Sequence, residues 1–277
     1  MSVTTDTVFH RIEKLILPKL ERLPVIATYA RSRGWPFVLS WIHRISGCLL
    51  VVYVLFHIYT LSLLKAPDAF DAKMRFFGLF IFVFLEWALA IPVIIHAING
   101  GRLILYEIFG SRKDNLLIRG VWAVSVIYVL LLAVMMIMGN QTVTSGFFWL
   151  TTAILAGSLV AVVGSKIWKT AASASWKFQR ITGAFLFIMV PAHLLFMHLN
   201  PGLGHEASVV VARMQNVFIK ILDLGLVISV LCHGGYGLLS IAKDYIPSKL
   251  QQNGITLAII IVLVIFGWVG VKLTISI

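Results

Sequence analysis

The chain has 277 residues, of which 60% are hydrophobic and only 12% are charged. Soluble globular domains contain about 45–50% apolar and about 25% charged residues, so this composition excludes an ordinary soluble enzyme. The net charge is +12, but Lys and Arg cluster between apolar runs and form no basic face with interleaved aromatic residues, which argues against nucleic-acid binding. The sequence predicts an all-α integral membrane protein, a bundle of transmembrane helices.

Residues 1–36 precede the first long apolar run and are predicted to form a cytoplasmic arm. Apolar residues recur there at roughly helical spacing among charged ones, which indicates an amphipathic helix on the membrane surface; a solvated arm explains the pattern equally well. Seven runs suited to crossing a bilayer follow. They cover residues 37–64, 76–109, 121–138, 147–164, 178–199, 217–241 and 255–271.

Lys and Arg flank the seven runs unevenly. Sixteen of them lie on the side of the N-terminus and five on the opposite side. The positive-inside rule then predicts a multi-pass protein of the inner (cytoplasmic) membrane, with its N-terminus in the cytoplasm and its C-terminus outside. Without the run 147–164, the weakest of the seven, this bias would disappear.

The sequence repeats itself at an offset of 136 residues. Arg44-Ile-Ser-Gly47 is matched by Arg180-Ile-Thr-Gly183, and each Arg is followed thirteen positions later by a histidine, His57 or His193. Four spans separate the two copies, so both insert in the same direction. The predicted organisation is a first repeat at 37–138, a connecting helix at 147–166 and a second repeat at 177–277.

A second pair of histidines follows the same repeat. His96-x-x-x-Gly100 is matched by His233-x-x-x-Gly237 at an offset of 137. At a rise of about 1.5 Å per residue, this pair lies at the inner ends of its helices. The pair formed by His57 and His193 lies near the outer ends.

Ionisable side chains inside a membrane are costly and indicate function by default, although a single histidine can also be an interhelical hydrogen bonder. Two facing imidazoles from neighbouring helices can supply both axial ligands of a haem iron. We therefore predict two haem b groups, an outer one held by His57 and His193 and an inner one held by His96 and His233.

Other polar and small residues fit the same hypothesis. Gly100 and Gly237 lie one turn from their histidines and leave room for a porphyrin, although close helix packing explains them too. Arg180 is a candidate for a haem propionate, and so are Arg44, Arg102 and Lys243; anchoring by the positive-inside rule explains these cations equally well.

Electrons passing through the haems need an acceptor in the lipid phase, and quinone is the natural one. Ser40 and Arg44 at the start of the first span, with Asp244 and Tyr245 at the end of the sixth, offer hydrogen-bond donors and a proton source; an interfacial belt explains them equally well. Glu86, deep in the second span, is a candidate proton relay or outer quinone ligand.

These motifs resemble those of the membrane-anchor cytochrome b of succinate:quinone oxidoreductases, across about residues 35–275. Ser40-x-x-His43-Arg44-x-Ser46-Gly47 is similar to the family's S-x-x-H-R-x-S-G. The segment from His96 to Arg102 is similar to the H-x-x-x-G-x-R of the larger anchor subunit. His233-x-x-x-Gly237, followed by Asp244-Tyr245, is similar to the H-x-x-x-G…D-Y of the smaller one.

The resemblance implies a fused, dihaem anchor, because His57 and His193 match the additional pair of the dihaem form and residues 179–183 are similar to its Q-R-x-T-G. The chain departs by carrying two more spans between the repeats. It also has Leu231 where some dihaem members have a glutamate next to the last ligand, which puts their transmembrane proton compensation in doubt here.

Partners follow from the same resemblance. An iron-sulfur subunit and, through it, a flavoprotein subunit would carry out the succinate or fumarate chemistry, which is not in this chain. Membrane lipid and quinone are expected partners, nucleic acid is not, and a higher oligomer is left open. The alternatives are the cytochrome b anchor of a formate dehydrogenase or hydrogenase, and a non-haem proton-coupled transporter.

Overall fold

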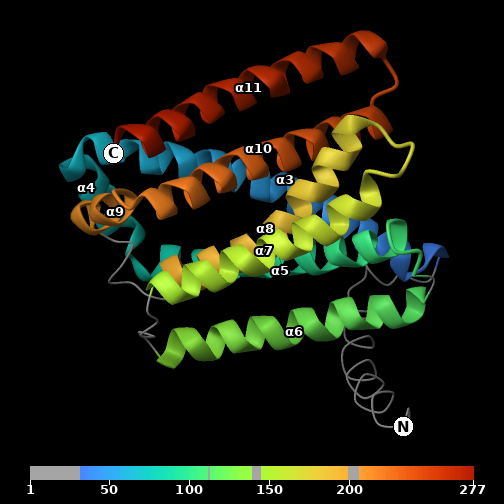
Figure 1. Ribbon diagram of the computed structural model, residues 1–277, viewed down its shortest axis with the longest axis horizontal. Helices are drawn as coiled ribbons and strands as arrows, with labels where there is room; N and C mark the ends of the chain where they lie inside the picture. Colours follow the sequence, from blue (N-terminus) through green and yellow to red (C-terminus); the bar gives the residue numbers. More distant parts are fainter. Residues whose placement is uncertain (1–31, 112, 139–144, 199–205) are drawn as a thin grey trace. The chain divides into compact units, whose positions relative to one another are not determined.

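The computed structural model describes residues 32–111, 113–138, 145–198 and 206–277 (Figure 1). The predicted amphipathic helix of the N-terminal arm lies outside these residues. The described part is α-helical without strands, which confirms the predicted fold class. Its elements are α3 (Trp35–Ser62), η1 (Leu63–Lys65), α4 (Pro67–Phe77), α5 (Phe80–Glu107), α6 (Asp114–Met138), α7 (Ser145–Ile167), α8 (Ala174–His198), α9 (Ala207–Met214), α10 (Val217–Tyr245) and α11 (Lys249–Ser276).

The long helices have the length and composition needed to cross a membrane. A helix of 28 residues, such as α5, is about 42 Å long at about 1.5 Å per residue, more than the hydrocarbon thickness of about 30 Å. Among the described residues, six helical segments qualify as membrane spans, in α3, α5, α7, α8, α10 and α11. The predicted span 121–138 lies within α6, and a total of seven spans stays a prediction.

The span predicted at 76–109 is wrong at its start. Phe76 and Phe77 end α4, a turn follows at Gly78 and Leu79, and α5 begins only at Phe80. The five aromatic residues between 76 and 84 extend the apolar run across this turn, and hydropathy alone does not reveal the break. Pro67 and Asp68, a proline and an acid in the first helical turn, are the signal that could have identified α4.

Hydroxyl groups inside the long helices bond back to their own backbone. The hydroxyls of Ser46, Thr152 and Thr182 donate to carbonyl oxygens four residues earlier, at 2.7 to 2.8 Å. A hydrocarbon environment offers no water to these groups. Local bonds of this kind allow polar residues within otherwise apolar spans.

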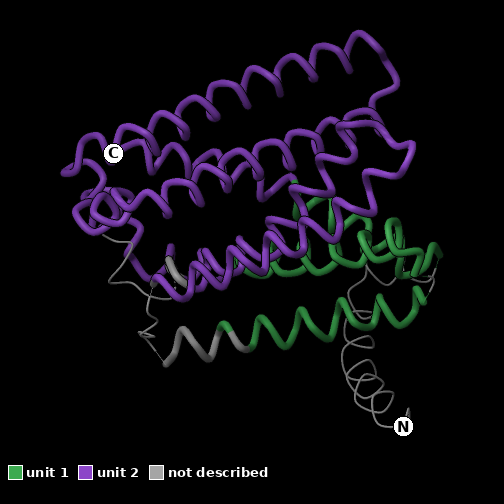
Figure 2. The backbone as a smooth tube through the Cα atoms, in the orientation of Figure 1, with its two compact units in different colours: residues 1–47, 88–134 green, residues 48–87, 135–277 purple. Residues whose placement is uncertain are grey.

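Two compact units divide the described chain, and the boundaries between them fall inside α3 and α5 (Figure 2). The first unit contains residues up to 47 and residues 88–134, and the second contains residues 48–87 and 135–277. This is a division by packing and does not follow the sequence repeat. Each histidine site is therefore described within one unit.

The first unit packs the start of α3 against α6. Leu39, Ile118, Val121 and Trp122 form its buried core, and the rings of Trp35 and Trp122 meet edge to face with centroids 5.8 Å apart. The apolar burial fixes the beginning of α3, where the S-x-x-H-R-x-S-G motif lies.

The second unit has close helix contacts at glycines. In α10, a Cβ added at Gly235 would collide with the side chain of Leu263 on α11, and one added at Gly270 of α11 would lie 2.8 Å from Val227. Small residues of this kind let membrane helices approach closely. A separate buried cluster joins α7, α8 and α10 through Trp149, Ala156, Met189, Ala192, Ile219 and Leu222.

Two short helices, α4 and α9, pack together in the second unit. They were not predicted, because each is short and amphipathic. Phe70 of α4 is 1% exposed, and the Asp71 carboxylate accepts a hydrogen bond of 2.8 Å from the backbone N–H of Ala207 at the start of α9. Asp71 and Ala207 are 136 residues apart, so both repeats carry a short helix here. Burial lowers the pKa of the Arg213 guanidinium on α9, opposed by the nearby Asp223 carboxylate.

Candidate functional site

His96 on α5 is held by the start of α3, within the first unit. Its Nδ1 lies 3.0 Å from the backbone oxygen of His43 and 3.3 Å from the Ser46 hydroxyl. A carbonyl oxygen only accepts, so Nδ1 carries the hydrogen and donates it. The neutral ring then has its lone pair on Nε2, the arrangement found in histidines that ligate metals.

His233 on α10 has the same arrangement in the second unit. Its Nδ1 lies 3.0 Å from the backbone oxygen of Gln179 at the start of α8. Gln179 is the repeat counterpart of His43, since 136 residues separate them. The two inner histidines thus have the same tautomer, set by equivalent backbone carbonyls in two separate units.

Two glycines make these contacts sterically possible. A Cβ added at Gly47 would lie 3.0 Å from Cε1 and 3.4 Å from Nδ1 of His96. At Gly183 the corresponding distances to His233 are 3.0 and 3.3 Å. Both are closer than ordinary van der Waals contact of about 3.5 to 4.0 Å. Each glycine was noticed as part of the repeat but was assigned no role, because the sequence does not reveal how closely two helices approach.

Gly100 and Gly237, predicted to leave room for a porphyrin, also occupy equivalent positions. A Cβ at Gly100 would lie 3.6 Å from the His43 ring, and one at Gly237 would lie 3.7 Å from the Gln179 amide nitrogen. These are ordinary contact distances. In the first unit the rings of His43 and His96 also stack, with centroids 3.9 Å apart and planes at 6°.

The predicted outer pair comes together in the second unit. The rings of His57 on α3 and His193 on α8 have centroids 6.1 Å apart and perpendicular planes, at 89°. Tyr53, one turn before His57, stacks on that ring at 5.6 Å. All three side chains are half-buried. Two helices that are far apart in sequence therefore bring two imidazoles into one small region.

The inner histidines lie in different units, His96 in the first and His233 in the second, and their pairing stays a prediction. The same holds for the predicted quinone residues. Ser40 and Arg44 are half-buried at the start of α3, whereas Asp244 and Tyr245 are exposed at the end of α10.

The charged residues near the motifs have partners of their own. Arg102 is buried, and its guanidinium donates to Asn99 at 3.0 Å and to the Asp114 carboxylate at 3.1 Å, a role that was not predicted. Arg180 donates to the Gln179 side chain at 2.7 Å and lies 4.9 Å from the centroid of the Trp176 ring. Among the described residues, no group of three or more His, Cys, Asp or Glu side chains converges on one point.

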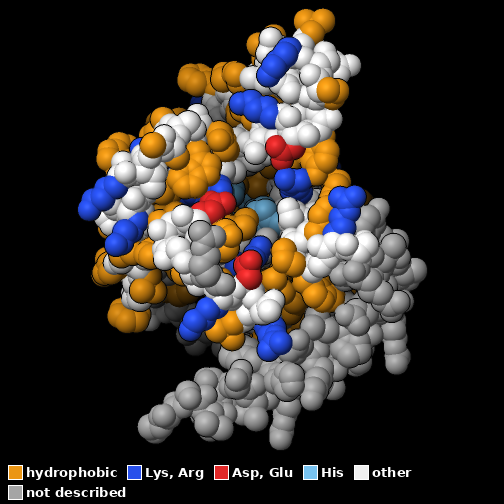
Figure 3. Space-filling model, turned by 90° about the vertical axis from the view of Figure 1, so that its right-hand side faces the viewer, with side chains coloured by type: hydrophobic (Ala, Val, Ile, Leu, Met, Phe, Trp, Pro, Cys, Tyr) orange, Lys and Arg blue, Asp and Glu red, His pale blue; other side chains and the backbone are white. Residues whose placement is uncertain are grey.

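The basic residues of the second unit gather where α7 and α10 end and α8 and α11 begin. Figure 3 views this side and shows Lys and Arg side chains distributed over it. They include Lys166, Lys169, Lys177, Lys243 and Lys249. One end of these helices is therefore strongly basic, as the topology prediction requires.

Comparison with known proteins places the chain in a family. The model of the "Succinate dehydrogenase/Fumarate reductase transmembrane subunit" family matches twice, at residues 28–135 and 164–271, and the two matches are 136 residues apart, the offset of the repeat. The chain is also similar to the succinate dehydrogenase 2 membrane subunit SdhC of Mycobacterium tuberculosis, with 30% identity over 104 residues, which cover 36% of this chain and 74% of that protein. No solved structure matches.

These matches cover most of both repeats, including all four histidines of the predicted haem pairs. The chain belongs to the family of succinate dehydrogenase and fumarate reductase transmembrane subunits.

Proposed function

We propose that this chain is the haem b-containing, quinone-reactive anchor of a succinate:quinone oxidoreductase, formed from two fused repeats. The observation that carries the proposal is the duplicated inner site. His96 and His233 each donate Nδ1–H to an equivalent backbone carbonyl, at 3.0 Å in both cases, beside an equivalent glycine. Such outer-shell bonds orient metal-ligating histidines and raise their basicity.

The outer pair fits the spacing of axial ligands. With iron–nitrogen bonds of about 2.1 Å and about 1.1 Å from nitrogen to ring centre, two axial imidazoles have centroids about 6.4 Å apart. The centroids of His57 and His193 are 6.1 Å apart. The proposal assigns this pair to the outer haem and assigns His96 and His233 to the inner haem.

When bound, the haem groups supply reversible one-electron transfer. The histidines hold and orient them, and the apolar helices exclude water. Arg180, held against Trp176 and Gln179, supplies a cation for a propionate. At the membrane boundary, Ser40 and Arg44 donate hydrogen bonds to a quinone headgroup, and Asp244 and Tyr245 provide its protons.

The proposed partners are an iron-sulfur subunit and, through it, a flavoprotein subunit that carries the dicarboxylate chemistry. The basic ends of the helices face the cytoplasm of a cell whose inner membrane contains the chain, in line with the positive-inside rule. Electrons then pass between the iron-sulfur subunit and membrane quinone in either direction.

Purification of the complex with its native subunits tests this proposal. We expect a b-type band in the reduced-minus-oxidised spectrum, and loss of the inner haem in a His96→Ala/His233→Ala variant. His43→Gln is the matched control, because it copies the residue at position 179 and keeps the backbone carbonyl that accepts from His96. It should retain haem.

Two outcomes would refute the proposal. A colourless complex would favour the proton-coupled transporter. Copurification with a molybdenum or nickel subunit in place of a flavoprotein would favour another respiratory complex.

A further inference from the structure

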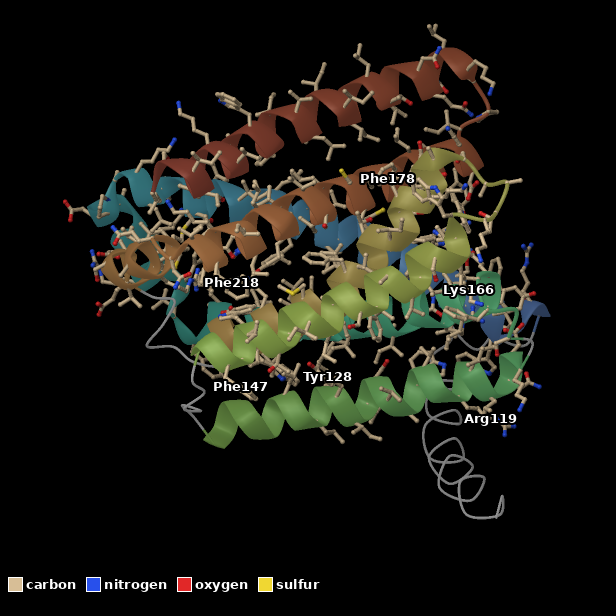
Figure 4. The ribbon with its side chains drawn as sticks, viewed as in Figure 1. Arg119, Tyr128, Phe147, Lys166, Phe178 and Phe218 are labelled. Atoms are coloured by element: carbon tan, nitrogen blue, oxygen red, sulfur yellow. The ribbon has the colours of Figure 1, made fainter. Side chains whose placement is uncertain are left out.

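The turn between α7 and α8 concentrates positive charge at one end of two membrane helices. Lys166 lies in the last turn of α7, Lys169 lies in the connecting turn, and Lys177 and Arg180 lie in the first turns of α8. Neither helix carries a carboxylate, because the sequence has no Asp or Glu between Asp114 and Glu206. Figure 4 shows the labelled Lys166 at this end of α7.

Two tryptophans hold part of this cluster in place. The Lys177 ammonium donates to the backbone oxygen of Trp168 at 3.2 Å and lies 5.7 Å from the centroid of its ring. Arg180 lies over the ring of Trp176. Trp168 is 65% exposed, and exposed tryptophans at helix ends are typical of the headgroup layer of a membrane. The cluster therefore lies at the depth of lipid phosphates.

An apolar surface continues from the cations along α7. Leu155, Val162 and Lys166 share one face of the helix, since seven and then four residues separate them. The side chains of Leu155 and Val162 are 55% and 50% exposed. An acidic protein surface in water would contact only the turn, whereas a phospholipid would place its headgroup on the cations and its acyl chains on this face.

We propose that residues 166–180 form a binding site for an anionic phospholipid of the phosphatidylglycerol or cardiolipin class. The phosphate oxygens accept hydrogen bonds from Lys166 and Lys169, whose side chains are exposed, and charge-assisted bonds of this kind are the stronger ones. Each Lys or Arg near a lipid phosphate favours anionic lipid by on the order of fivefold. The site does not depend on haem or quinone.

Fluorescence quenching of Trp168 by brominated lipid tests the proposal. The purified complex is reconstituted in phosphatidylcholine vesicles with increasing fractions of dibrominated phosphatidylglycerol or dibrominated phosphatidylcholine. The signal of Trp168 is the difference between the native complex and a Trp168→Phe variant. We expect half-quenching at a phosphatidylglycerol fraction at least fivefold lower than the phosphatidylcholine fraction that gives the same effect.

Charge variants locate the site. Lys166→Gln/Lys169→Gln should raise the half-quenching fraction of phosphatidylglycerol at least fivefold. Lys65→Gln/Lys73→Gln, which removes the same charge from η1 and α4, should leave it unchanged. Equal quenching by both lipids, or equal effects of the two double variants, would overturn the proposal. So would quenching by neither lipid until the soluble subunits are removed, because a protein would then cover the turn.

Discussion

Replacing Gly183 by alanine should weaken the inner haem site without unfolding the chain. The new Cβ would lie 3.0 Å from Cε1 of His233, at least about 0.5 Å inside the optimal carbon–carbon distance of about 3.5 to 4.0 Å. The ring has to move by a similar amount. Such a shift stretches the 3.0 Å bond from Nδ1 to the Gln179 oxygen to about 3.5 Å, beyond the usual range.

The magnitude follows from two costs. Overpacking of this size costs about 1–3 kcal/mol, and loss of an outer-shell partner weakens metal binding by about 10- to 100-fold. We therefore expect haem affinity to fall about tenfold to a hundredfold. The helix itself should be more stable, because alanine is favoured over glycine in a helix interior by about 0.5–1 kcal/mol.

The assay is haem titration of the purified complex, followed by the b-type absorption band and the haem midpoint potential. Gly164→Ala is the matched control, because it lies inside α7 and its Cβ would have nothing within 4 Å. It should leave haem binding unchanged. If Gly183→Ala binds haem with native affinity and an unchanged midpoint potential, the contact between Gly183 and His233 does not position a ligand, and the reasoning fails.

The remaining predictions concern the outer pair and two structural contacts. His57→Ala/His193→Ala should lower the haem content from two to one per chain; a pyridine haemochrome assay showing two would contradict the outer assignment. Asp71→Ala should lower stability by about 0.5–2 kcal/mol, the usual cost of a lost N-cap, measured as the midpoint of thermal unfolding, with Asp68→Ala on the exposed side of α4 as control; equal midpoints would show that the bond to α9 is not stabilising. Asp114→Asn should destabilise the complex in the same assay by on the order of 1 kcal/mol, because Asp114 is 42% exposed and solvent screens its pair with Arg102. Lys113→Gln should have no effect, and an equal loss in both variants would refute the assignment.

The long helices and the repeat could be predicted from sequence because both are written in local patterns. Apolar runs near 20 residues long identify spans, and the equal spacing from Arg44 to His57 and from Arg180 to His193 identifies the outer pair, whose rings the structure brings together. The family matches, offset by the same 136 residues, support the repeat.

Features that depend on the distance between helices could not be predicted. The roles of Gly47 and Gly183 follow from a 3.0 Å approach of an imidazole, which no spacing rule contains. Arg102 was considered for a propionate, but its partner Asp114 comes from the next helix. The short helices α4 and α9 were missed because their charged residues hide them from a search for apolar runs.

The number of haem b groups per chain in the purified complex, with every subunit identified, tests the central claim most directly. We predict two b-type haems per chain, together with an iron-sulfur subunit and a flavoprotein subunit. A complex with these subunits but no b-type haem would contradict the account, because the four histidines would then have another purpose.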